Sequence, residues 1–172
     1  MAKPRLMQKT HVRIADVDAS KRLRPVSEAG VESLLASIAE IGIIKDAIHV
    51  RQRRDGSLVL VAGGHRLEAA KRLGQEEIEA KVWTDVTDDW AKLMEIDDNL
   101  AGAEMNALDT AVFLAERKRV YEKLHPETRA DAFKGNQHTG KLASDIVSFA
   151  TATAEKFGIS KRQVERIIAA GM

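Results

Sequence analysis

Two adjacent glycines, Gly63 and Gly64, stand between an apolar stretch and a helical pattern, and His65 and Arg66 follow them directly. Glycines at such a junction let the backbone approach a ligand closely and leave the first helical amides free to bind an anion. Arg66 could add a charge-assisted fork to phosphate oxygens, and His65 a further hydrogen bond. The same spacing is typical of a tight strand-to-helix connection without a ligand, so these residues alone leave both interpretations open.

A second candidate site is the run of oxygen donors Asp97, Asp98 and Asn99, near the end of another helical pattern. Carboxylate and amide oxygens suit a hard cation such as Mg²⁺ beside the phosphates of a nucleotide. Acidic patches at helix ends are more often solvated or serve as caps, so a purely structural role competes with the metal site.

The most specific pattern lies near the carboxyl end. Small Ala154, then Gly158, then Val164 have the spacing of a helix-turn-helix, in which they allow close helix approach, take the turn and bury the second helix. Lys and Arg there could hold DNA phosphates, while Gln163 or Arg162 could read base edges. Ser160, which can also cap this helix, is one of the residues expected to face DNA, which are Ser160, Lys161, Arg162, Gln163 and Arg166. A generic helical hairpin is the alternative.

The elements that position these residues follow from apolar spacing and turn residues. A one-sided helix is predicted from Ser27, its cap, to Gly42, its end. Its inward stripe includes Ile41, and Leu73 is expected to face inward from a later helix. Strands are predicted at 47–51, 58–62 and 78–83, with a hairpin turn at 54–57. Further helices are predicted at 65–73, 87–99, from 106 onward, 151–157 and 161–169, and a loop at 126–140.

This order of elements predicts an α+β protein with two modules. We expect a small α/β domain at residues 1–104, and a linking helix, a loop and the helix-turn-helix at residues 105–172. The chain has 172 residues, of which 44% are hydrophobic and 31% charged, which is enough for both modules to fold.

Charge is segregated along the chain, although the net charge is only +1. Residues 1–24 are basic, residues 85–109 carry eight acidic side chains against Lys92 alone, and basic residues return to the majority from Arg117 onward. The two basic ends of the chain could bind a polyanion, or they could be solvated helix faces and a frayed terminus. No run approaches the roughly 20 apolar residues of a membrane span, so we expect a cytoplasmic protein without a membrane partner. The absence of cysteine excludes thiolate chemistry and disulfides.

Taken in order, the motifs resemble the ParB family over almost the whole chain. The matching stretches are SIAEIGIIKDAIHVR, VAGGHRLEAAKRLG, IDDNLAGAEMNALDTA and the helix-turn-helix segment. The resemblance implies a ParB- and sulfiredoxin-like amino-terminal α/β domain followed by an all-α DNA-binding region. It also implies that the protein binds CTP, or another nucleotide, with Mg²⁺. Such a protein acts as a nucleotide-switched homodimer on DNA, in plasmid or chromosome partition or in transcriptional regulation.

ParB proteins hold the triphosphate with a Gly-Glu-Arg-Arg-type turn, which this chain matches only in part. Gly63 and Arg66 agree with it, whereas Gly64 replaces its Glu, His65 its first Arg and Glu68 a later Arg. Each lost charged contact to phosphate could remove about 1.5–3 kcal/mol. Weaker CTP binding, or a different nucleotide, is therefore expected.

The family also uses a Glu-Asn pair, with which Asp98 and Asn99 align. The resemblance implies Asn99 as the metal or phosphate contact and Asp98 as a shortened catalytic carboxylate, and it leaves open whether CTP is slowly hydrolysed. Gly102 replaces the Arg that usually follows. Sulfiredoxin is similar too, but its chemistry needs the cysteine that is absent here. Nucleases and nucleotide-dependent phosphotransferases of this fold, with Mg²⁺ at residues 95–98, form the competing class, and the helix-turn-helix argues against them.

Overall fold

The computed structural model describes residues 3–102, 107–128 and 149–171 of the chain. They belong to two units, residues 1–95 and residues 96–172, each with an apolar core of its own. The boundary falls inside helix α3 (Asp88–Gly102). The predicted α+β class is confirmed, while the predicted module boundary at residue 104 stays a prediction.

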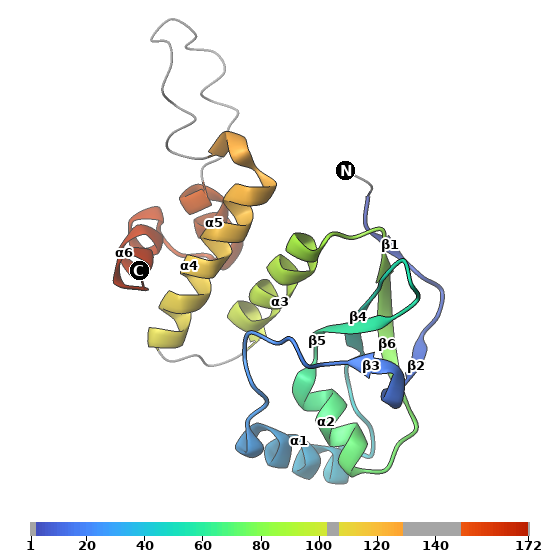
Figure 1. Cartoon of the computed structure of the whole chain (residues 1–172). Coiled ribbons are helices and arrows are strands. Elements are labelled where there is room, and N and C mark those ends of the chain that lie inside the picture. Colours follow the sequence, from blue (N-terminus) through green and yellow to red (C-terminus); the bar gives the residue numbers. More distant parts are fainter. Residues whose placement is uncertain (1–2, 103–106, 129–148, 172) are drawn as a thin grey trace, which may run out of the picture. The chain divides into compact units, whose positions relative to one another are not determined.

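A six-stranded mixed sheet lies at the centre of the first unit (Figure 1). Strand β6 pairs in parallel with β4, β4 is antiparallel to β5, and β5 is parallel to β3. Strands β1 and β2 both pair antiparallel with β6. The strands are β1 (Arg5–Leu6), β2 (His11–Arg13), β3 (Val17–Asp18), β4 (Ile48–Gln52), β5 (Leu58–Ala62) and β6 (Glu77–Thr84), with a short 3-10 helix η1 (Ile14–Asp16) before β3.

The β4–β5 hairpin has the turn that its sequence predicts. Gly56 has a φ of 84°, and the Asp55 carboxylate accepts hydrogen bonds from the Ser57 amide and hydroxyl at 2.9 and 2.6 Å. Side chains on one face of the sheet join the main apolar core together with Leu67 of helix α2 (Gly64–Arg72). On β6, Trp83 is tilted against Trp90 of α3, with ring centroids 5.4 Å apart.

The basic amino-terminal segment is ordered by the sheet, so a frayed terminus is the wrong description for residues 5–18. Val12 is completely buried, and its strand pairs with β6 in the register Val12 to Ile78. These strands are only two or three residues long, too short for alternation to reveal them. They form because longer strands supply the hydrogen-bonding edge.

Helices α1 (Glu28–Ile41) and α2 (Gly64–Arg72) pack against each other through Val31, Ile38 and Ala69 (Figure 1). The predicted ends of α1 are confirmed, since the Ser27 hydroxyl accepts a hydrogen bond from the Gly30 amide and Gly42 is left-handed with a φ of 88°. Ile41 and Leu73, predicted to face inward, are instead 57% and 47% exposed. Both residues lie at helix ends. The spacing of apolar residues predicts which face of a helix is buried, but it does not predict how far along the helix the packing partner extends.

The second unit is helical. It contains the end of α3, then α4 (Ala107–Leu124), the 3-10 helix η2 (Pro126–Thr128), α5 (Phe149–Phe157) and α6 (Lys161–Gly171). Leu114, Phe149, Val164 and Ile168 form its apolar core. Most of the loop predicted at 126–140 lies outside the described residues. Within the described parts of the chain, every helix is too short or too polar to cross a bilayer.

Candidate functional site

The Gly63–Gly64 turn joins β5 directly to α2, as the sequence predicts. Gly63 has a φ of 96°, in the left-handed region that favours glycine. A Cβ atom there would lie 2.8 Å from the Ile48 Cγ2 atom and 3.1 Å from the Arg66 Nε atom. Gly63 also has no side chain to cap α2, so the helix begins without a side-chain acceptor. This geometry is suited to an anion at the first amides of α2.

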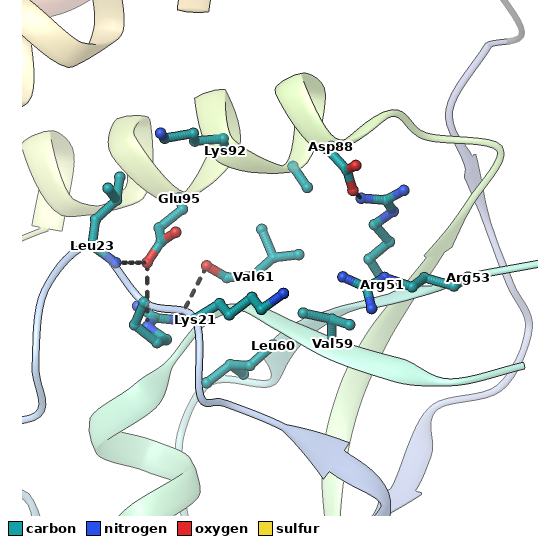
Figure 2. A pocket seen from close by; sticks show the side chains of 12 residues that line it. Lys21, Leu23, Arg51, Arg53, Val59, Leu60, Val61, Asp88, Lys92 and Glu95 are labelled. Atoms are coloured by element: carbon teal, nitrogen blue, oxygen red, sulfur yellow. Dashed lines mark hydrogen bonds and ion pairs between the residues drawn. The ribbon is translucent and has the colours of Figure 1, made fainter.

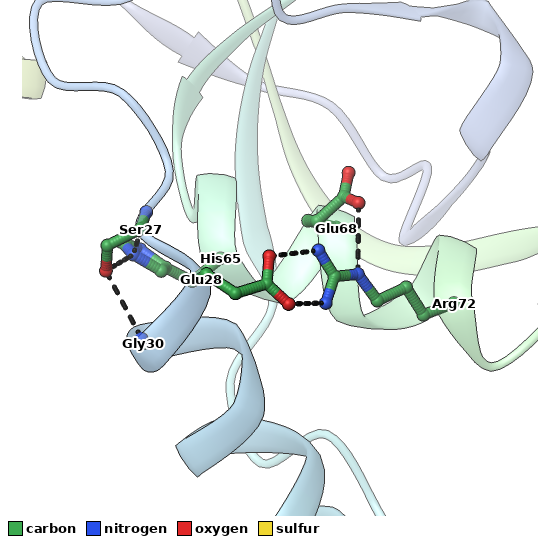
Figure 3. Close-up of polar contacts among 6 residues, drawn as sticks. All are labelled: Ser27, Glu28, Gly30, His65, Glu68 and Arg72. Carbon is green, nitrogen blue, oxygen red and sulfur yellow. Dashed lines mark hydrogen bonds and ion pairs between the residues drawn. The ribbon is translucent and has the colours of Figure 1, made fainter.

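His65 contacts the start of α1 (Figure 3). Its Nε2 atom accepts a hydrogen bond from the Ser27 amide at 3.2 Å and lies 3.1 Å from the Ser27 hydroxyl oxygen, which in turn caps α1 at Gly30. A Cβ atom on Gly30 would come within 2.6 Å of the imidazole, so this close approach requires glycine. Burial lowers the pKa of His65, and the charges of Arg24 and Arg22 lower it further. The neutral imidazole therefore acts as the acceptor at Nε2.

Arg66 turns back toward the sheet. Its Nη1 atom donates a hydrogen bond to the Ala47 carbonyl oxygen at 2.6 Å, and its guanidinium lies beside Gly63. A guanidinium has five donors. The bond to Ala47 uses one of these donors and fixes the position of the guanidinium across the turn. Its other donors lie near the first amides of α2.

Glu68, where the family resemblance implies an arginine, forms an internal ion pair (Figure 3). Arg72 bridges the two helices through its Nε atom, 3.3 Å from Glu68 of α2, and through two bonds of 2.5 and 2.8 Å to Glu28 of α1. The bond from Arg72 lowers the pKa of Glu28. Glu28 follows Ser27 directly, so this bridge holds the start of α1 against α2, where His65 contacts it.

The acidic residues of α3 separate into different roles. Asp97 accepts hydrogen bonds from Arg117 Nε at 2.7 Å and Lys156 Nζ at 2.5 Å, which is a structural role. Asp98 is exposed, and Asn99 is half-buried with contacts of its own. The described residues contain no cluster of three or more His, Asp or Glu side chains that could hold a metal. One carboxylate and one amide still fit Mg²⁺, which keeps several waters and shares phosphate ligands. The roles of Asp98 and Asn99 stay predictions.

Arg117 is a residue whose position the sequence did not predict. It is only 3% exposed, donates to the Thr153 hydroxyl at 2.7 Å and pairs with Asp97. Its guanidinium also lies 5.5–5.7 Å from the centroids of three aromatic rings, those of Tyr121, Phe149 and Phe157. In the sequence it is merely part of a basic cluster. Its partners are 20 and 36 positions away, beyond the reach of any local spacing rule.

Helices α5 and α6 are joined by a tight turn centred on Gly158, which is left-handed with a φ of 65°. The Ser160 hydroxyl accepts a hydrogen bond from the Gln163 amide at 3.2 Å and so caps α6. Val164 is completely buried. The four other residues expected to face DNA are exposed on α6, namely Lys161, Arg162, Gln163 and Arg166. Contact of this surface with DNA stays a prediction.

Residues 3–100 match the family model described as the ParB N-terminal domain, which is more than half of the chain. Similar solved structures include the C-terminally truncated chromosome-partitioning protein ParB from Caulobacter crescentus complexed to the centromeric parS site. It aligns with a TM-score of 0.57 and 20% identity, over 93% of this chain and 70% of that one. A pNOB8-like ParB-N domain aligns with a TM-score of 0.65 and 15% identity, over 96% and 69%.

The Caulobacter protein complexed with CTP-gamma-S aligns with a TM-score of 0.46 and 22% identity, over 97% of this chain and 77% of that one. No curated protein matches the chain. At these identities the structural likeness concerns the fold alone, and the predicted ParB-like fold is confirmed. Together with the match over residues 3–100, it shows that the chain belongs to the ParB N-terminal domain family.

Proposed function

We propose that this protein is a ParB-like DNA-binding protein whose hold on DNA is controlled by a nucleotide. The observation that carries the proposal is helix α6, where Arg162 and Arg166, four residues apart, share the face opposite the buried Val164 and Ile168. The helix is therefore anchored by one face and presents cations on the other. The protein would act in the cytoplasm, on a chromosome or plasmid, as a homodimer in partition or transcriptional regulation.

The cations of α6 make DNA affinity dependent on salt. If Lys161, Arg162 and Arg166 each neutralise one phosphate, the plot of log affinity against log salt should have a slope of about −2.7. Fluorescence anisotropy of a labelled duplex, titrated at several salt concentrations, measures this slope. A flat response would contradict the proposed phosphate contacts.

We assign the nucleotide to the Gly63–Gly64 turn, with the first amides of α2 and Arg66 on its phosphates and His65 beside them. The role of Asn99 as a contact to phosphate or Mg²⁺ is proposed from the family resemblance alone. Three features support the assignment: the left-handed glycine, the uncapped helix start and the positioned guanidinium. CTP is the nucleotide that the family resemblance implies. Asp98 would be the carboxylate for any slow hydrolysis.

The assignment predicts that Arg66→Ala weakens CTP binding by roughly 10- to 150-fold, because one charge-assisted contact to phosphate is worth about 1.5–3 kcal/mol. Titration of labelled CTP, ATP, GTP and UTP with Mg²⁺ measures the loss and the preferred base. Lys71→Ala is the matched control, since it removes an exposed cation from the far end of the same helix. Equal losses in both variants would contradict the assignment.

The lowered pKa of His65 makes stability depend on pH. The unfolded chain protonates near the ordinary value of 6.5, whereas the folded chain protonates only at lower pH. Stability is therefore complete above about pH 6.5 and falls as the pH drops toward the folded value. Unfolding free energies at pH 7.5 and 5.5 should show a larger acid loss in the wild type than in His65→Gln. The same loss in both would show that another group is responsible.

The competing class, a Mg²⁺-dependent nuclease or phosphotransferase, has less support from the acidic region. Glu95 accepts a hydrogen bond from the Leu23 amide at 3.1 Å and pairs with Arg22, and Asp97 pairs with Arg117. Two of the carboxylates at residues 95–98 are therefore already neutralised within the fold. Metal-dependent DNA cleavage or phosphate transfer that is lost in Asp98→Asn would overturn the DNA-binding proposal in favour of an enzyme.

A further inference from the structure

A separate pocket of about 480 Å³ lies between the segment 21–23, strands β4 and β5, and the first turns of α3 (Figure 2). No residue of the Gly63–Arg66 turn lines it. Five cationic side chains do: Lys21 and Arg22 from the first segment, Arg51 from β4, Arg53 just after it, and Lys92 from α3. Two carboxylates also line it, those of Asp88 and Glu95.

Both carboxylates are already paired with arginines of the same wall. Glu95 lies 3.3 Å from Arg22 Nε, and Asp88 pairs with Arg51 Nη1 (Figure 2). These pairs hold the two arginines in place. In all, the lining contains five cationic side chains and two carboxylates. The lining therefore keeps an excess of three positive charges inside a concavity, where low-dielectric walls concentrate the field.

The hydrogen-bonding state of the two arginines points to an acceptor in this pocket. In the part of the chain that the structure describes, the buried side-chain polar atoms without a hydrogen-bond partner are Arg22 Nε and Arg51 Nε. Arg22 Nε is within ion-pair distance of Glu95, but without the direction of a hydrogen bond. Buried donors are nearly always satisfied, and here both exceptions line one cationic pocket.

We propose that this pocket is a second anion site, which takes the phosphate group of a small molecule. The side chains of Arg22 and Arg51 are only 12% and 15% exposed, so a rigid duplex backbone would not reach them, whereas a compact anion can enter. Guanidinium groups suit phosphate because their planar forks match its oxygens. Lys21 and Arg53 complete the charge around it.

The occupant would also act on the turn that precedes α2. Arg22 donates from Nη1 to the Val61 carbonyl oxygen at 3.2 Å, two residues before Gly63. Its guanidinium carbon lies 3.7 Å from where a Cβ atom of Gly64 would be. Arg22 therefore stands between the pocket and the turn, so the two sites must be distinguished by experiment.

The test is titration of the whole chain with inorganic phosphate and with pyrophosphate at constant ionic strength, chloride being the balancing anion. The Nε–H signals of Arg22 and Arg51 are followed by NMR. We expect saturable shifts of both signals, weakened roughly tenfold or more in the double variant Lys21→Gln, Arg53→Gln. Arg54→Gln, on the same hairpin but outside the lining, is the matched control and should bind as the wild type does.

The outcomes separate the sources of phosphate. Arg66→Ala should leave these shifts unchanged even if it abolishes nucleotide binding, so the pocket and the proposed nucleotide site can fail independently. Loss of the shifts in Arg66→Ala would assign the phosphate to the turn and overturn the second site. Shifts that do not saturate, or that chloride reproduces, would also overturn it. So would a double variant that loses duplex DNA affinity while the wild type shows no saturable phosphate binding, since the surface would then belong to nucleic acid.

Discussion

Replacing Arg117 with methionine is expected to lower the free energy of unfolding of the second unit by about 3–5 kcal/mol. Arg117 is buried and pairs with Asp97, and it donates to Thr153. Its removal leaves a largely buried carboxylate without its main partner and a hydroxyl without its donor, and such groups are costly in a low-dielectric interior. The bond to Lys156, which is half exposed, compensates only in part.

Two spectroscopic probes locate the loss. Trp83 and Trp90 both belong to residues 1–95, so their fluorescence follows the first unit, whereas circular dichroism is weighted toward the helices of the second. Urea unfolding followed by both should show the loss in circular dichroism alone.

Arg119→Met is the matched control for Arg117→Met. It removes an arginine from the same helix whose side chain is 73% exposed and pairs with Glu116, and such surface pairs contribute about 0–1 kcal/mol. Adding Asp97→Asn to Arg117→Met should restore part of the stability, since it removes the uncompensated charge. Equal losses in the control and the variant, or strict additivity with Asp97→Asn, would contradict the structural role given to this pair.

The double variant Arg162→Ala, Arg166→Ala is expected to lose most of the DNA affinity. Two charged contacts to phosphate are together worth about 3–6 kcal/mol, which corresponds to a loss of roughly 10²- to 10⁴-fold. The fold should be retained, because both side chains are exposed and the buried anchors of α6 are untouched. Anisotropy with a labelled duplex at low salt measures the loss, and the slope against salt should flatten by about two units.

A control for net charge is the pair Lys118→Ala, Arg119→Ala on α4, which also removes two positive charges but none from α6. It should weaken binding only slightly. Unchanged DNA affinity in the α6 variant, or an equal loss in the α4 variant, would contradict the proposal that α6 contacts DNA.

The local features of this fold could be predicted because their causes are local. Ser27 and Gly42 define the ends of α1 through a cap and a left-handed residue, and Gly63 defines the junction of β5 and α2 in the same way. The turn and cap between α5 and α6 were equally readable from Gly158 and Ser160. In each case the residue type and its immediate neighbours carry the whole signal.

The features that escaped prediction depend on partners far apart in the sequence. The hydrogen bond from Arg66 to the Ala47 carbonyl oxygen depends on where the residue before β4 passes the turn. Asp97 was interpreted as part of a metal site, whereas its carboxylate accepts a hydrogen bond from Arg117. The pairing of Glu95 with the segment at Arg22 spans more than 70 positions. Rules based on residue spacing along the chain do not predict contacts between residues this far apart in the sequence.

The short amino-terminal strands have a consequence for the solubility of the protein. Strand β6 pairs with β4 along one edge, and its other edge is covered by β1 and β2. Between these two strands the Met7 amide donates to the Val82 carbonyl oxygen, and the Thr10 carbonyl oxygen accepts from the Ala80 amide. An uncovered edge with alternating apolar residues is a template for another chain. The basic amino-terminal segment therefore protects this edge of β6. Its removal would expose unpaired backbone groups, through which copies of the protein could pair and aggregate.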